Sequence, residues 1–198
     1  MTDERFASAL AAIDAANDGD PNTITIDGVA RPKEHVHAEL MTSWVRRLDP
    51  SADDAQLLAA RAHHLRRWAT RRSDYPEGRS GYLRWRKEAN RRHATDVGRI
   101  LQDCGYEPDT VDRVQQIIRK ERLRTDEVVQ THEDALCLVF LQTQLSDLVA
   151  RLGDSKAFDV LCKTLAKMSP RGRNEARALE LADGEHAVIV AALQEVGG

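Results

Sequence analysis

Apolar residues recur every three or four positions along almost the whole chain, which is the spacing that places them on one face of an α-helix. Near the start, Phe6, Leu10 and Ile13 follow this spacing. The stretch DALCLVFLQTQLSDLVARL is apolar enough to form the central core helix. The pattern predicts helices over about 3–17, 32–48, 53–70, 81–102, 109–120, 131–152, 155–168, 171–182 and 186–196.

One short stretch has strand chemistry instead. The β-branched run TITI stands between Gly19 and Gly28, so residues 19–28 are expected to form a loop or a minimal hairpin. Ser51 or Asp53 is suited to cap the helix that follows. The fold class expected is therefore all-α, with about seven to nine helices.

Length and composition limit the class of protein. With 198 residues, 41% of them apolar and 31% charged, the chain is expected to fold as one globular domain. The sequence has no run of eighteen apolar residues, so no membrane span is expected. Its acidic start is unlike a signal peptide. Three widely spaced cysteines, Cys104, Cys137 and Cys162, favour a reduced, cytoplasmic protein with buried thiols.

Charge is distributed unevenly along the chain. The formal net charge is −3, which argues against a protein that coats nucleic acid. Residues 61–99, called the basic segment below, nevertheless hold 12 basic residues, 11 of them Arg, against four acidic ones. The remainder holds 17 basic and 28 acidic residues. A segment with this surplus attracts anions.

The basic segment also contains aromatic residues between its arginines, a combination that stacks bases and grips phosphates. We expect substrate contacts from seven polar side chains of this segment. These are Arg66, Arg71, Arg72, Arg79, Tyr82, Arg84 and Arg86. The alternative is a surface loop held by pairs of arginine and acidic side chains.

Histidines supply the candidate metal ligands. Six of the seven, His35, His37, His63, His64, His93 and His132, lie on four predicted helices that could meet in a bundle. Imidazole and carboxylate groups bind Zn, Mn, Fe or Ni. The alternative, preferred for His35 and for the seventh, His186, is a histidine on a helix surface.

The order of these motifs resembles the HD-domain metal phosphohydrolases. That superfamily has a first His, a His-Asp doublet after an apolar run, and a distal Asp. EHVH, AARAHH and HEDALCL stand in the same order here. The resemblance implies an HD-like core over about 31–152, a C-terminal helical extension over about 153–198, and a divalent metal: Mn, Zn, Fe, Co or Ni. The implied ligands are His37, His63, His64, His93 and Asp134.

Two positions depart from that pattern. His64 stands where the doublet normally has Asp, and Arg67 stands where some members have a catalytic acid. The resemblance places Lys120 near a position that often carries a further ligand. We expect Arg67 and Lys120 to act in catalysis, and Glu133 to orient a ligating histidine.

At finer grain the chain resembles the domain-of-unknown-function 4202 family over about residues 3–182. RSDYPEGRSGYLRWR and KTLAKMSPRG carry this likeness together with the motifs above. The family implies no activity.

Three functions remain open at this stage. The first is a divalent-metal-dependent phosphohydrolase that acts on a nucleotide or another small phosphorylated metabolite. The second is a catalytically inactive HD-like module that binds RNA or a nucleotide through residues 61–99. The third is a metal protein with redox or oxygen chemistry. No membrane partner is expected, and the sequence does not indicate an oligomeric state.

Overall fold

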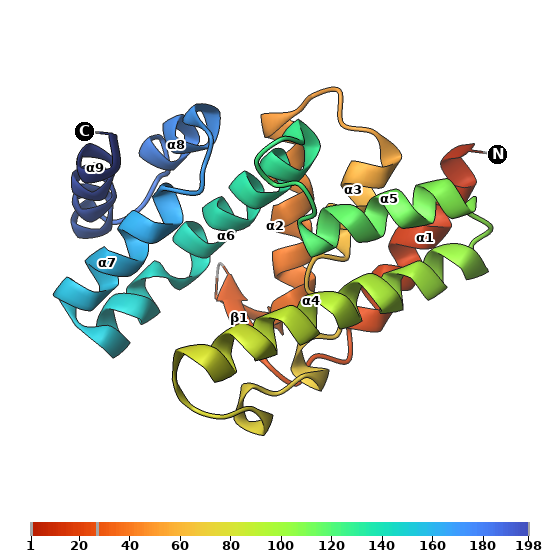
Figure 1. Ribbon diagram of the computed structural model, residues 1–198, viewed down its shortest axis with the longest axis horizontal. Helices are drawn as coiled ribbons and strands as arrows, with labels where there is room; N and C mark the ends of the chain where they lie inside the picture. Colours follow the sequence, from red (N-terminus) through yellow and green to blue (C-terminus); the bar gives the residue numbers. More distant parts are fainter. Residues whose placement is uncertain (1, 27, 198) are drawn as a thin grey trace. The chain divides into compact units, whose positions relative to one another are not determined.

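The computed structural model describes residues 2–26 and 28–197, and it confirms the all-α class (Figure 1). The described residues form nine α-helices, one short hairpin and two 3₁₀ turns. The elements are α1 (Thr2–Asn17), β1 (Thr23–Ile26), β2 (Val29–Pro32), α2 (Lys33–Leu48), α3 (Asp54–Arg61), η1 (Arg67–Ala69), η2 (Arg72–Asp74), α4 (Gly78–Asp103), α5 (Pro108–Arg119), α6 (Glu127–Leu152), α7 (Asp154–Leu165), α8 (Pro170–Arg177) and α9 (Asp183–Gly197).

Contacts between residues divide the chain into two compact units. The first unit contains the described residues up to 46 and residues 51–121, and the second contains 47–50 and the described residues from 122 onward. Helix α6 is therefore grouped with α7–α9, whereas the sequence placed it in a core over 31–152. The single domain expected from the sequence stays a prediction.

The first unit has its core between α1, α3, α4 and α5. Helices α4 and α5 lie side by side, and both α1 and α5 contact α3 (Figure 1). Leu58, Leu101 and Ile117 are fully buried there. Gly98 allows α4 and α5 to approach closely, since a Cβ at this position would lie 2.2 Å from the Gln115 amide nitrogen.

The TITI run forms the first strand of a two-stranded antiparallel hairpin, which is one of the two alternatives expected for this stretch. Ile26 pairs with Val29, and Thr23 pairs with Pro32. The hairpin leads directly into α2, where the Asp20 carboxylate accepts a hydrogen bond of 3.0 Å from the Glu34 backbone N–H. An acidic side chain at this position satisfies a free donor of the first helical turn. This bond fixes the start of α2, which carries two of the residues discussed below.

The helix expected over 53–70 is shorter than predicted. Asp53 caps α3 through a reciprocal bond with Gln56, but α3 ends at Arg61. The chain then passes through turns, and Arg66 adopts a left-handed conformation with φ of 51°. That conformation cannot continue an α-helix. The Arg66 backbone N–H donates a hydrogen bond to Asn17, which lies outside the segment, so local periodicity does not reveal it.

The second unit is built around α6. Helices α7 and α8 both contact α6, and α9 contacts α7 and α8. By length and mean hydropathy, α6 is one helix that could cross a membrane, but the core helix of a soluble protein meets the same criterion. It buries three consecutive polar residues, His132, Glu133 and Asp134. The cytoplasmic location stays a prediction.

All three cysteines are free thiols in the structure. Cys137 is buried, whereas Cys104 and Cys162 are half-buried. Only Cys137 therefore has the full burial that the sequence suggested for all three cysteines.

Candidate metal centre

A carboxylate and two imidazoles meet at the start of α2. Glu34 and His37 lie one turn apart on this helix, and His64 reaches them from the turns after α3. One possible ligand atom from each lies within 4.8 Å of the others, and Glu34 and His37 are buried. We call these three residues the metal cluster. Ligand bonds are about 2 Å long, so donors of one ion lie within about 4 Å of each other and a small contraction would suffice.

The two ring nitrogens of His64 have different partners. Its Nε2 lies 3.0 Å from an Arg67 guanidinium nitrogen, which can only donate. Nε2 is therefore the acceptor, and Nδ1–H donates to Glu34 Oε2 at 3.1 Å. His37 Nδ1 lies 3.5 Å from the same carboxylate oxygen. Glu34 Oε2 is thus the common point of the metal cluster.

His93 lies beside the metal cluster, with its ring centroid 5.9 Å from that of His64. Its Nδ1 is 2.8 Å from the Leu65 carbonyl oxygen, which can only accept, so Nδ1 carries the proton. Nε2 consequently has a free lone pair, and this atom is buried without a hydrogen-bond partner among the described residues. A histidine held in this way by a carbonyl has the tautomer of a metal ligand.

Both histidines are held neutral. Burial lowers the pKa of His93 to about 4. Burial, and then the positive charge of Arg67, hold the pKa of His64 well below its usual range. Neutral imidazoles keep a lone pair for an ion at neutral pH.

Two cations lie close to these imidazoles. Arg67 contacts His64, and its Nε lies 3.9 Å from Glu34 Oε1. On its other side the guanidinium lies 4.9 Å from the Trp85 ring centroid. Lys120, at the end of α5, is near enough to lower the pKa of His64. Arg67 and Lys120, the two side chains expected to act in catalysis, therefore both lie near enough to His64 to lower its pKa.

The neighbouring histidines have other surroundings. The His63 ring lies against that of His64, with centroids 4.2 Å apart, and His63 is buried. Its role as a ligand stays a prediction. His35 points to Asp18 instead, with 2.7 Å between Nδ1 and the carboxylate.

A family model described as Domain of unknown function (DUF4202) matches residues 7–189. The chain belongs to the DUF4202 family. No curated protein and no solved structure matches it. The family match supports the finer of the two resemblances seen in the sequence, and it says nothing of the HD-domain superfamily.

In this DUF4202 protein, the Asp134 carboxylate is hydrogen-bonded to residues of the second unit. Its carboxylate accepts hydrogen bonds of 2.9 Å from the Ser169 backbone N–H and from the Gln130 amide, and a further one from the Ser169 hydroxyl. Gly172 makes room for it, because a Cβ there would lie 2.6 Å from its carboxyl carbon. Burial raises the pKa of Asp134, against the effect of these hydrogen bonds. Its role as a metal ligand stays a prediction, as does the orienting role of the buried Glu133.

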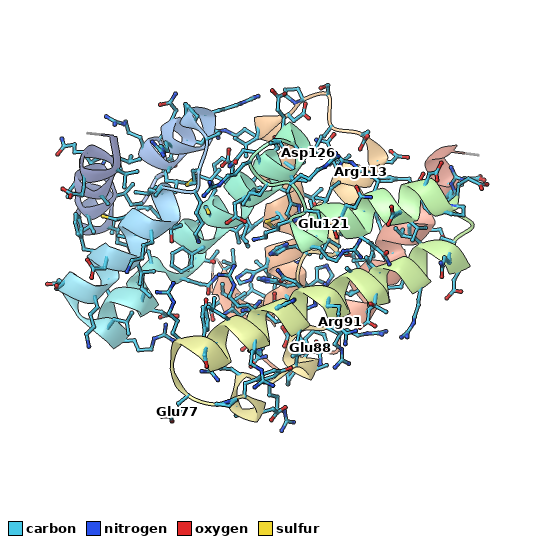
Figure 2. All side chains as sticks on the ribbon, in the orientation of Figure 1. Glu77, Glu88, Arg91, Arg113, Glu121 and Asp126 are labelled. Carbon is cyan, nitrogen blue, oxygen red and sulfur yellow. The ribbon has the colours of Figure 1, made fainter. Side chains whose placement is uncertain are left out.

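The basic segment of the DUF4202 protein has both paired and unpaired cations. Glu88 pairs with Arg91 on α4, as Figure 2 shows, and Asp96 lies near Arg92 and Arg99. Within the described part of the chain, no ion pair engages the exposed side chains of a second group. That group is Arg66, Arg71, Arg79, Arg84 and Lys87.

The other expected substrate residues are tied to the loop before α4. Arg72 donates to the Tyr75 carbonyl oxygen at 2.9 Å. Arg86 lies 5.8 Å from the ring centroid of Tyr82, which is 42% exposed. Gly81 lets the loop close, since a Cβ there would lie 1.8 Å from the Pro76 carbonyl oxygen.

Glu34 was not among the ligands predicted from the sequence. The signal was present, because Glu34 and His37 form the pair Glu-x-x-His, which places a carboxylate and an imidazole on one face of a helix. The HD-domain order of motifs instead indicated Asp134 as the carboxylate ligand.

Proposed function

We propose that this DUF4202 protein is a divalent-metal-dependent phosphohydrolase that acts on a small phosphorylated metabolite such as a nucleotide. The observation that carries the proposal is the metal cluster, in which one carboxylate and two imidazoles converge within 4.8 Å. Mixed nitrogen and oxygen donors suit Mn, Fe, Co, Ni or Zn.

The charge and the number of these donors suit a divalent ion. Glu34 would supply the negative charge, and His37 and His64 the neutral donors. The buried Nε2 of His93 has no other partner among the described residues, and it is the natural fourth donor. A divalent ion bound to these residues would lower the pKa of a bound water toward neutrality, which would supply a nucleophile for phosphate-ester hydrolysis.

The surrounding side chains suit the charge of a phosphoryl group. Arg67 contacts His64, and Lys120 is near enough to lower the pKa of His64, so these two cations would stabilise negative charge that develops on phosphoryl oxygens. The planar guanidinium of Arg67 can donate two parallel hydrogen bonds to such a group. The unpaired arginines of the basic segment would attract the anion toward the site.

The test is metal analysis of the purified protein, followed by a screen of phosphate esters with Mn²⁺, Fe²⁺, Co²⁺, Ni²⁺ and Zn²⁺. We expect bound metal and phosphate release in the native protein. Glu34→Gln and His64→Ala should each lose the metal, because each removes a donor. Retention of a full complement of metal by both variants would overturn the assignment of the cluster.

His186→Ala is the matched control. This residue belongs to the second unit, where its Nε2 contacts the Arg177 carbonyl oxygen. The same chemical change there should leave metal content and phosphate release unaltered. If native protein binds metal but hydrolyses no ester, the metal site stands and the reaction class falls.

A second candidate is a module that binds RNA or a nucleotide without catalysis. It is favoured by the hydrogen-bonded series Glu34–His64–Arg67, which is complete without an ion. The exposed cations of the basic segment would contact phosphates, and Tyr82 would stack on a base. Binding of labelled oligonucleotide that persists in EDTA and in His64→Ala would support this candidate. Absence of binding at low salt, where phosphate contacts are strongest, would exclude it.

A further inference from the structure

The turn that joins His64 to Arg67 has an unusual conformation. The Arg67 N–H donates to the His64 carbonyl oxygen at 2.9 Å, which closes a four-residue turn. Its third residue, Arg66, has φ of 51° and ψ of 41°. Glycine or asparagine normally occupies a position with positive φ, because a larger side chain meets a steric penalty there. Something outside the turn must therefore hold Arg66 in place.

The central peptide group of this turn is held from both sides. Its carbonyl oxygen, from Leu65, accepts the hydrogen bond of 2.8 Å from His93 Nδ1 on α4. Its N–H, from Arg66, donates to Asn17 Oδ1 at 3.0 Å, at the end of α1. Asn17 is 1% exposed and His93 is 0% exposed, so water does not compete for either hydrogen bond.

In the side chain of Asn17, only the oxygen makes a hydrogen bond within the described residues, and that bond is the one from the Arg66 N–H. Its side-chain nitrogen is buried without a hydrogen-bond partner among the described residues. A buried amide that leaves two N–H groups unpaired is costly, which calls for an explanation beyond packing. The bond from Arg66 supplies one.

The orientation of the peptide group decides the tautomer of His93. A non-glycine residue at the third turn position prefers negative φ, and reaching it rotates the central peptide and turns the Leu65 carbonyl away. Nδ1 of His93 would then lose its acceptor. With the native orientation, Nδ1 keeps the proton and Nε2 keeps the lone pair beside His64.

We propose that Asn17 is a positioning residue for the candidate metal centre, and that it acts on His93 through the Leu65–Arg66 peptide group. By holding this peptide, it keeps the Nε2 lone pair of His93 available as a fourth donor beside the metal cluster. The effect on the metal rests on the proposed function, whereas the effect on the tautomer does not.

The experiment compares four proteins in the full chain: the native protein, Asn17→Ala, Arg66→Gly and the double variant. The first readout is the ¹⁵N chemical shift of the His93 ring in metal-free protein, which reports the nitrogen that carries the proton. The second is the affinity for Co²⁺, with its visible spectrum reporting the number of donors. Asn174→Ala, on the exposed face of α8, is the matched control.

We expect Asn17→Ala to shift the His93 proton away from a fixed Nδ1 position and to weaken Co²⁺ binding about 10- to 100-fold, as loss of an orienting partner does. Arg66→Gly should keep the native tautomer, because glycine adopts positive φ without penalty. For the same reason the double variant should regain the tautomer and most of the affinity. Asn174→Ala should behave as the native protein.

Two results would overturn the inference. One is a folded Asn17→Ala protein with an unchanged His93 tautomer, and the other is a double variant in which glycine restores nothing. If Asn17→Ala does not fold, the double variant decides by the same criterion. A shifted tautomer in a set of proteins that never bind Co²⁺ would leave the role of Asn17 intact and would refute the proposed metal centre.

Discussion

At His64 one imidazole faces a carboxylate on one nitrogen and a guanidinium on the other. If Nδ1 binds an ion, the neutral ring carries its proton on Nε2, which then cannot accept from Arg67. Metal and Arg67 are therefore alternative partners of this histidine. Release of Arg67 would leave its guanidinium over Trp85, free to donate to an anion.

This exclusion leads to a prediction for Arg67→Met. Removing the charged donor should tighten metal binding on the order of tenfold, since the broken hydrogen bond no longer opposes the ion. Phosphate release should nevertheless fall by about 100-fold or more, because a cation for the developing charge is lost. Titration calorimetry and steady-state kinetics measure the two effects. Weaker metal binding in this variant would contradict the exclusion, and Arg67→Lys serves as the comparison that keeps the charge.

His93 gives the metal-free protein a defined pH dependence. Its pKa is about 4 in the folded chain against 6.5 in an ordinary environment, so the unfolded chain binds the extra proton between these values. The contribution of this group to the free energy of unfolding is complete above pH 6.5 and is lost as the pH falls toward 4. We expect a loss of about 3 kcal/mol, from roughly 1.4 kcal/mol per pKa unit.

Urea unfolding in EDTA across this pH range tests the expectation. His93→Gln lacks the titrating ring, and its amide can still donate to the Leu65 carbonyl oxygen. The native protein should lose more stability than this variant as the pH falls. Parallel profiles for the two proteins would show that His93 is not held neutral by burial.

At the scale of elements, Asp134 joins α6 to the start of α8. Ser169 caps α8 by accepting from the Gly172 N–H at 3.1 Å, and its own hydroxyl and backbone N–H both donate to Asp134. We expect Ser169→Ala to lower the free energy of unfolding by about 1 kcal/mol. Asp134→Ala should lower it by about 1–3 kcal/mol, since it leaves buried donors without an acceptor.

The same pair of variants tests whether Asp134 also binds metal, as the HD-domain resemblance implied. Ser169→Ala weakens the junction of α6 and α8 but keeps the carboxylate, so it is the control for stability. Metal content that is normal in both variants would contradict the sequence-based assignment of Asp134. Loss of metal in Asp134→Ala alone would support it.

The sequence predicted the helices well because their periodicity is local. The largest exception was the helix expected over 53–70, which ends at Arg61, and the helix expected over 171–182 also ends early, at Arg177. The residues after it have ordinary helical spacing, and the left-handed conformation of Arg66 depends on Asn17, 49 positions earlier. Periodicity within one segment cannot contain that information.

At the scale of the whole molecule, the −3 net charge combines a basic segment with an acidic remainder. Five exposed cations of the segment have no ion pair among the described residues, so they should attract phosphate groups. This attraction is screened over about 10 Å at 0.1 M salt. We expect the affinity for pyrophosphate to fall as sodium chloride is raised.

Oligonucleotides of increasing length distinguish the two candidate functions. A focused site for a small anion should show little gain in affinity once the terminal phosphates are bound. A nucleic-acid module should show an affinity that rises with length, with a steeper dependence on salt. Arg79→Ala and Arg84→Ala should weaken binding in either case, and unchanged binding in both would remove the basic segment from the site.

The sequence by itself determined the all-α class, the position of most helix ends and the basic segment, and it offered His37, His64, His93, Arg67 and Lys120 as candidate site residues. The fold class, the helix ends and the basic segment follow from periodicity and composition, which are local properties of the chain, whereas the candidate residues follow from the HD-domain resemblance. Only the tertiary structure showed that Glu34 is the carboxylate beside these histidines and that Asn17 holds the peptide on which His93 depends. Both facts arise from hydrogen bonds between residues far apart in sequence, and such pairings are set by the packing of whole helices.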